Sequence, residues 1–300
     1  MRNLFEHTSA PWLRYSSYEY RENENGELYI VVSKGAKAEM YSPMDNAEII
    51  VMDAVKAGRL AATDKRSDEA KRQILDFVNK YGFLGLMTAI PTTADFIEYE
   101  SVYLPKNHFI TEEKLSAEHY LKYFFPFEKL DFKKNKKNSV LKVKDKEGIA
   151  AALSVDDAPR AVAMSFQRQY AEKYDWIAEE FVDWYFTFMT TFIYYKDKDV
   201  LDDENKELMQ KGMKSFGAIA PTYRLELGEK HPVIIWDFYS LAVMLQMSAS
   251  FLLTDPDTKI GVCKHCGDLF IAERKGTEFC SAKCKNQYNV YKSRKKSKGD

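Results

Sequence analysis

All four cysteines of this 300-residue chain lie in the stretch CKHCGDLFIAERKGTEFCSAKC, residues 263–284. Two residues separate Cys263 from Cys266, thirteen residues follow, and three residues separate Cys280 from Cys284. Four thiolates complete the tetrahedral shell of a structural Zn²⁺ ion, whereas catalytic zinc keeps one position open for water or substrate. The spacing therefore predicts a zinc site that holds structure and does not activate water.

The residues between the cysteines carry the local signals of a folded module. Gly267 allows a tight turn after the second cysteine, residues 269–271 (Leu-Phe-Ile) favour a strand, and Ser281 can cap a helix that carries Cys284. His265 lies between the first two cysteines but is surplus to four sulfur ligands, so we expect a solvent-facing loop residue. We divide the chain into a mostly helical body, residues 1–257, and a zinc finger with a basic C-terminal helix, residues 258–300.

Two disulfides are the alternative use of four cysteines. The first residues, MRNLFEHTSAPWLRYSS, lack the positive region and apolar stretch of a signal peptide. We therefore expect a cytoplasmic protein, whose reducing surroundings favour bound zinc over disulfides.

The module resembles treble-clef zinc fingers, and the phrase FCSAKCKNQY resembles the C-terminal finger of bacterial proteins of the CGNR zinc-finger type. In that family Gly-Asn-Arg follows the last cysteine; here Lys285, Asn286 and Gln287 follow it, and only the asparagine is shared. Family members are regarded as transcription regulators with a helical N-terminal region, so the resemblance implies a DNA-directed role. Treble clefs also serve as structural caps and as protein-binding modules.

The distribution of charge also distinguishes the finger from the rest of the chain. Residues 258–300 hold eleven lysines and arginines against four acidic residues, a net charge of +7, and the remaining residues carry −8. Such asymmetry indicates an anionic partner for the C-terminal segment.

A helix beginning at Ser281 would place Cys284, Tyr288 and Tyr291 on one face, packed on the zinc hairpin. Cations would border that face on both sides, and such a helix can lie along phosphates with salt-sensitive, largely sequence-independent affinity. The candidate nucleic-acid contacts are Lys283, Lys285, Lys292, Arg294, Lys295 and Lys296. The alternative is a solubilising tail without a partner.

Composition and periodicity predict an α+β fold that is predominantly helical, with an N-terminal β-hairpin over residues 15–32 around Asn25-Gly26. A further strand is expected at residues 223–227, and residues 97–103 also alternate as a strand would. Helices are expected at residues 43–58, 67–81, 168–195, 201–216 and 232–253. The last helix is the longest apolar stretch, and we interpret it as buried and not as a membrane span.

Two other features of the body allow alternative interpretations. A lysine-rich run at residues 131–147 predicts an exposed loop and a possible internal boundary, with a second phosphate-contacting patch as the alternative. The helix at residues 168–195 bears an aromatic stripe, which predicts core packing, with a ligand pocket as the alternative. Its acidic residues Glu179, Glu180 and Asp183 are expected on a solvated face.

The sequence contains no motif that identifies a catalytic site. None of the five histidines lies in a metal-binding pair, and there is no phosphate-binding glycine loop or nucleophile elbow. We therefore expect a zinc-binding protein that binds nucleic acid, DNA in preference to RNA, with transcription regulation as its candidate role. A protein-interaction or structural role for the finger is the first alternative, and an enzyme such as a nuclease, with its site in the helical body, is the second.

Overall fold

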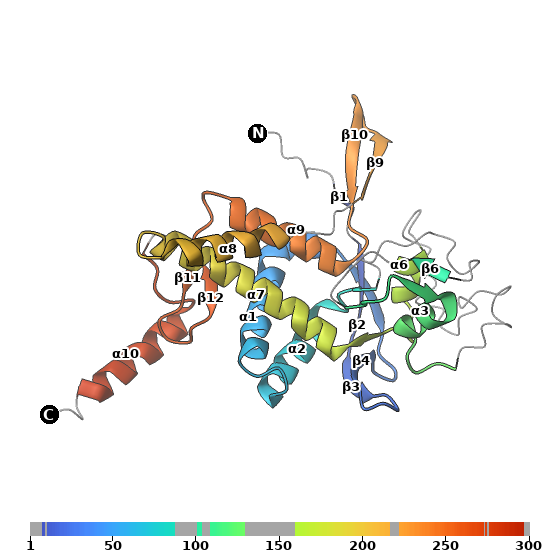
Figure 1. The fold of residues 1–300 in the computed structure, drawn as a ribbon, viewed down its shortest axis with the longest axis horizontal. Helices are drawn as coiled ribbons and strands as arrows, with labels where there is room; N and C mark the ends of the chain where they lie inside the picture. Colours follow the sequence, from blue (N-terminus) through green and yellow to red (C-terminus); the bar gives the residue numbers. More distant parts are fainter. Residues whose placement is uncertain are drawn as a thin grey trace.

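The computed structural model describes residues 8–9, 11–87, 101–103, 109–129, 160–216, 222–272, 274 and 276–296 (Figure 1). The elements up to residue 165 are β1 (Thr8–Ser9), β2 (Trp12–Tyr15), β3 (Tyr18–Glu22), β4 (Leu28–Val32), β5 (Ala38–Tyr41), the 3-10 helix η1 (Pro43–Asn46), α1 (Ala47–Thr63), α2 (Asp68–Tyr81), β6 (Ser101–Tyr103), β7 (Lys114–Ser116), α3 (Ala117–Phe124) and α6 (Arg160–Ser165). The later elements are β8 (Ala171–Lys173), α7 (Tyr174–Asp197), α8 (Asp203–Ser215), β9 (Thr222–Leu227), β10 (Pro232–Asp237), α9 (Leu241–Thr254), β11 (Ile260–Val262), β12 (Leu269–Ile271) and α10 (Ala282–Lys296).

The predicted α+β class and the N-terminal hairpin are confirmed. Strands β3 and β4 pair antiparallel from Tyr18 with Val32 to Glu22 with Leu28, and Gly26 in the turn has a φ of 74°. Strand β8 joins the other edge of β4, while β2 pairs with β5 in a separate ribbon. The lysine-rich run at residues 131–147 and the first part of the strand expected at residues 97–103 lie outside the described residues; Ser101–Tyr103 form β6.

Helices α1 and α2 pack on each other, but both ends of the first helix differ from the prediction. Pro43 opens a short 3-10 turn, and the α-helix runs from Ala47 through Gly58 to Thr63. Gly58 does not end the helix because it lies where α1 crosses α7: a Cβ there would lie 1.9 Å from the carbonyl oxygen of Phe181. The ends of α2 are as expected, with Ser67 capping the amide of Ala70.

The long aromatic helix is α7, which begins at Tyr174 and not at residue 168. Residues 171–173 instead form β8 against β4, so the sheet takes the first part of the predicted helix. The aromatic stripe is core, as expected: its buried rings pack on their neighbours, for example Phe181 on Phe77 with ring centroids 4.7 Å apart. The buried rings of this stripe are Tyr170, which precedes α7, and four rings within the helix: Tyr174, Phe181, Trp184 and Phe188.

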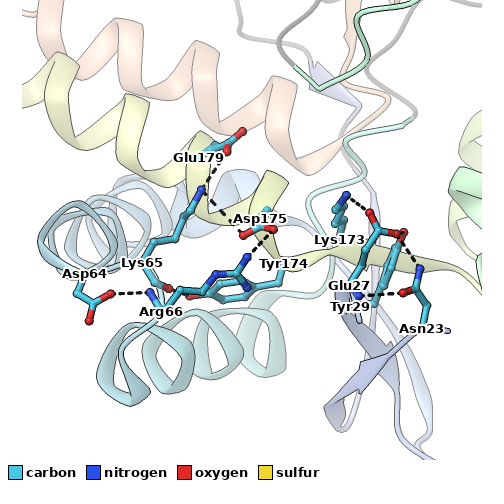
Figure 2. Close-up of polar contacts among 10 residues, drawn as sticks. All are labelled: Asn23, Glu27, Tyr29, Asp64, Lys65, Arg66, Lys173, Tyr174, Asp175 and Glu179. Atoms are coloured by element: carbon cyan, nitrogen blue, oxygen red, sulfur yellow. Dashed lines mark hydrogen bonds and ion pairs between the residues drawn. The ribbon is translucent and has the colours of Figure 1, made fainter. Parts of the chain in front are cut away.

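Polar contacts join the first two turns of α7 to the loop between α1 and α2 (Figure 2). Lys65 contacts Glu179 at 3.0 Å and Arg66 contacts Asp175 at 3.0 Å, while the Tyr174 hydroxyl donates to the Lys65 carbonyl. The acidic face of α7 is therefore only partly solvated. Glu180 departs further from the expectation, because it is 8% exposed.

The segment preceding α9 differs from the prediction. Residues 232–237, expected as the start of an apolar helix, form strand β10, which pairs along its whole length with β9. The run Val-Ile-Ile-Trp combines β-branched and aromatic residues that favour a strand, and Ser240 then caps the true helix. Strands β9 and β10 stand away from the helices as an arm (Figure 1).

Helix α9 is buried along most of its length and packs on α1 and α7. Among the described residues, none of the helices is both long and apolar enough to cross a membrane.

Candidate metal centre and basic helix

The C-terminal finger consists of the hairpin β11–β12 followed by α10. Strand β12 occupies the predicted residues 269–271, and Ser281 accepts a hydrogen bond from the amide of Cys284, as a helix cap should. Gly267 follows the second cysteine with a φ of 76°, and its amide donates to the Cys263 carbonyl at 2.9 Å. Only glycine adopts this backbone region at little cost, so it closes the turn that brings the first two cysteines together.

These elements bring the four predicted cysteines into one cluster. The sulfurs of Cys263, Cys266, Cys280 and Cys284 all lie within 4.8 Å of one another. Cys266 and Cys280 are 3.7 Å apart, and Cys280 and Cys284 are 3.5 Å apart. A disulfide needs about 2.05 Å, whereas metal–sulfur bonds of about 2.3 Å give a tetrahedron with edges of about 3.8 Å. The four sulfurs are thus positioned to hold one metal ion.

The backbone around the cluster favours the thiolate form of one of the four cysteines, Cys263. Burial raises the pKa of the Cys263 thiol, but backbone N–H groups of Cys266, Cys280 and His265 outweigh that effect and lower it to about 6. Burial raises the pKa of Cys280 to about 11 and that of Cys266 well above its usual range. Four thiolates this close repel one another unless a cation lies between them, and metal binding would displace the remaining protons.

The sequence predicted that His265 faces the solvent, but the residue is only partly exposed. Its ring stacks on Tyr291 of α10 with centroids 5.7 Å apart and an interplanar angle of 16°. Tyr288 packs on Phe279 at 5.2 Å, so both rings of the predicted apolar face contact the rest of the finger, although Tyr291 remains 57% exposed. These two ring contacts and Cys284 attach α10 to the segment that carries the other three cysteines.

The rest of α10 is exposed. Lys283, Lys285, Lys292 and Arg294 have exposed side chains on this helix. Lys295 and Lys296 complete its last turn, and their side chains lie outside the described residues. The helix projects from the body at the end opposite the N-terminal sheets (Figure 1). A helix that is polar around most of its surface gains little from its own burial, so its exposed face is available to a partner.

A hollow of about 580 Å³ lies beside the first turn of α10. Arg274, from the turn after β12, and Lys285, from α10, contribute cations to its wall, and Thr277 and Ser281 contribute hydroxyls. Arg274 is not among the cations that the sequence predicted to contact nucleic acid. Its position in a basic segment, after a strand and before the third cysteine, was the feature of the sequence that could have placed it near α10.

The finger also contacts the body, which the sequence did not indicate. Arg59 of α1 donates to Asp268 of the finger at 2.7 Å, and their side chains are 29% and 14% exposed. Leu269 is 6% exposed and belongs to the main hydrophobic core. A pair separated by 209 residues in sequence leaves no local pattern from which it could be predicted.

Comparison with protein-family models, curated proteins and solved structures finds no match for the chain. The resemblance of FCSAKCKNQY to CGNR-type fingers is therefore not supported by a family match, and the cysteine cluster is the part of it that the structure supports.

Proposed function

We propose that residues 258–300 are a zinc finger that binds nucleic acid, duplex DNA in preference to RNA, through the cations of α10. The supporting observation is the exposed cationic helix attached to a four-cysteine cluster. Zinc is the metal we propose because four sulfur ligands in a tetrahedral arrangement suit it. We place the protein in the cytoplasm, where thiolates stay available to the metal.

Zinc would act here through structure. It would fix the start of α10 by holding Cys280 and Cys284 against the first two cysteines, and the helix then carries Lys285 and Lys292 along a phosphate backbone. Binding of this kind releases counterions, so the affinity falls steeply with salt. A transcription-regulating role would follow if one DNA sequence were preferred over others.

The experiment replaces Lys285, Lys292 and Lys296 with glutamine and measures duplex binding by fluorescence anisotropy across a salt series. If each lysine neutralises one phosphate, the slope of log affinity against log salt becomes shallower by up to about 2.7, since each contact contributes about 0.9. An unchanged affinity and slope would contradict the proposed contact surface.

The matched control removes the same charge from α8, at Lys206, Lys211 and Lys214. Lys206 and Lys211 already have acidic partners on their own helix, Asp203 and Glu207. We expect their replacement by glutamine to leave the salt slope unchanged, which separates a local contact from an effect of net charge.

The contact between Arg59 and Asp268 favours a second candidate function, in which the finger caps the helical body. Under that proposal loss of zinc lowers the stability of the whole chain and no nucleic acid binds. The two roles are compatible, because a finger fixed on α1 can still present α10 to a partner. The anisotropy measurement distinguishes a cap alone from a cap that also binds.

A further inference from the structure

The arm formed by β9 and β10 carries an apolar face that is covered only at its base, where Trp236 packs against the main core; the rest has no covering element among the described residues. Cross-strand partners share one face of a ribbon. On this face Tyr223 lies opposite Trp236, Leu225 opposite Ile234 and Leu227 opposite Pro232. The exposed fractions are 63% for Tyr223, 68% for Leu225, 93% for Leu227 and 44% for Ile234. Contiguous apolar side chains at this exposure are unusual on a free surface and mark an interaction site.

The arm also leaves one strand edge open. In the described part of the chain β9 pairs only with β10, so the backbone groups on its other side point away from the sheet. The far edge of β10 is less available, because β1 covers its base and Pro232 at its start has no N–H group. An open edge of this kind is a template for pairing with another strand.

The sequence of β9 is complementary to itself. If two copies of the strand pair antiparallel about Leu225, Arg224 lies opposite Glu226 of the second copy, and Tyr223 lies opposite Leu227 of the second copy. Both charges then face opposite charges on one side of the sheet, and the apolar residues meet on the other side. Opposite charges and aromatic–aliphatic pairs both stabilise cross-strand neighbours.

Other registers lose this complementarity. A shift that centres the pair on Arg224 or on Glu226 places like charges directly opposite each other. A shift by a single residue brings the apolar face of one copy beside the polar face of the other. The alternation of Tyr223 to Leu227 therefore specifies one register.

We propose that β9 is a self-association edge, through which two copies of the chain pair antiparallel about Leu225 and join their β1-β10-β9 sheets into a continuous six-stranded sheet with a two-fold axis. The charges on the arm support a second copy over an anionic partner. Arg224 is already paired with Glu226 and Asp237, so the strand offers no excess of cations to a phosphate or a lipid surface. A two-fold interface uses the same patch on both subunits, as this strand requires.

The first test is the mass of the full-length chain in solution, measured by light scattering over a concentration series. One strand pair with the side chains of one face lies at the small end of specific interfaces, below about 1,200 Å² in total, so we expect a weak dimer that forms as concentration rises. The mass should rise from 34.8 kDa toward twice that value. A mass of one chain at every concentration up to about 1 mM would overturn the proposal and leave the apolar face to a different protein.

The second test determines the register by oxidative cross-linking with oxidised glutathione. Leu225→Cys would place two thiols opposite each other, about 5 Å apart between Cα atoms, within the range of a disulfide. Leu227→Cys is the control: its side chain is more exposed, but the two copies would lie about 13 Å apart along the strands.

We expect Leu225→Cys to give at least about fivefold more covalent dimer than Leu227→Cys, with the unmodified chain as background for the native cysteines. Equal cross-linking, or more from Leu227→Cys, would overturn the register. Glu226→Lys supplies an independent readout, because it would oppose four cations at the interface and should shift the mass to one chain, whereas Glu226→Gln should retain the dimer. Retention of the dimer by Glu226→Lys would also overturn the pairing.

Discussion

Gly58→Ala is expected to destabilise the protein although alanine is the better helix former. The glycine lies on α1 at its crossing with α7, where an added Cβ would lie 1.9 Å from the Phe181 carbonyl oxygen and 3.0 Å from the Cβ of Tyr185. The obstacle is backbone, so no rotamer change relieves it. The two helices would have to separate by about 1 Å or more in a close-packed interior.

The magnitude follows from two opposing effects. Overpacking a core costs about 1–3 kcal/mol, and a contact this short belongs at the upper end. Alanine returns about 1 kcal/mol of helix propensity. We therefore expect a net loss of about 2 kcal/mol in the free energy of unfolding. Arg59, the next residue on α1, contacts the finger, so separation of the helices should also weaken the attachment of the finger.

The matched control is Gly212→Ala on α8, where an added Cβ meets nothing within 4 Å. There only the propensity changes, and the stability should rise by up to about 1 kcal/mol. Urea unfolding followed by circular dichroism measures both variants. A Gly58→Ala protein as stable as the parent, with Gly212→Ala stabilised, would refute the close helix crossing.

Three further outcomes are expected. Arg59→Ala leaves the mostly buried Asp268 carboxylate without its partner and should lower the free energy of unfolding by about 1–3 kcal/mol, measured by urea titration. The ammonium of Lys173 lowers the pKa of Glu27, so this pair stabilises the fold above pH 4.5 and the stabilisation is lost as pH falls through the lowered pKa (Figure 2). The destabilisation caused by Glu27→Gln should therefore be complete at pH 7 and should shrink as the pH falls below 4.5. Cys280→Ser should remove one ligand, so that elemental analysis no longer finds one zinc ion per chain. It should also lower the melting temperature of the body, because the finger contributes to the same hydrophobic core.

For each of these three predictions, one experimental result would contradict it. Lys211→Ala breaks an exposed ion pair and should change the free energy of unfolding by less than about 0.5 kcal/mol. If Arg59→Ala had no larger effect, the contact between Arg59 and Asp268 would not stabilise the fold. Parallel pH profiles of Glu27→Gln and the parent would refute the ion pair. A body transition that Cys280→Ser leaves unchanged would show that the finger unfolds independently.

The sequence was informative where one short segment carries the whole signal. The spacing of the cysteines predicted their cluster, and the predicted cap Ser281 marked the start of α10 correctly because a cap is a local interaction. The Asn25-Gly26 turn likewise predicted its hairpin, since the required backbone conformation favours those residues.

It failed where distant residues compete for the same segment. Residues 171–173 have a helical pattern but pair with β4, and Gly58 resembles a helix end but serves a crossing. Residues 232–237 are mostly apolar, which fits a buried helix as well as a strand, and their pairing with β9 makes them a strand. The attachment of the finger to α1 depends on Arg59 and Asp268, which only the folded chain brings together.

The proposed nucleic-acid interface is tested most directly by binding of the zinc-loaded, full-length protein to mixed-sequence duplex DNA and to single-stranded RNA across a salt series. We expect the logarithm of the affinity to fall linearly with the logarithm of the salt concentration, the duplex to bind more tightly, and binding to be lost when a chelator removes the metal. Absence of binding to either nucleic acid at low salt would contradict the proposed interface and leave the finger as a structural cap.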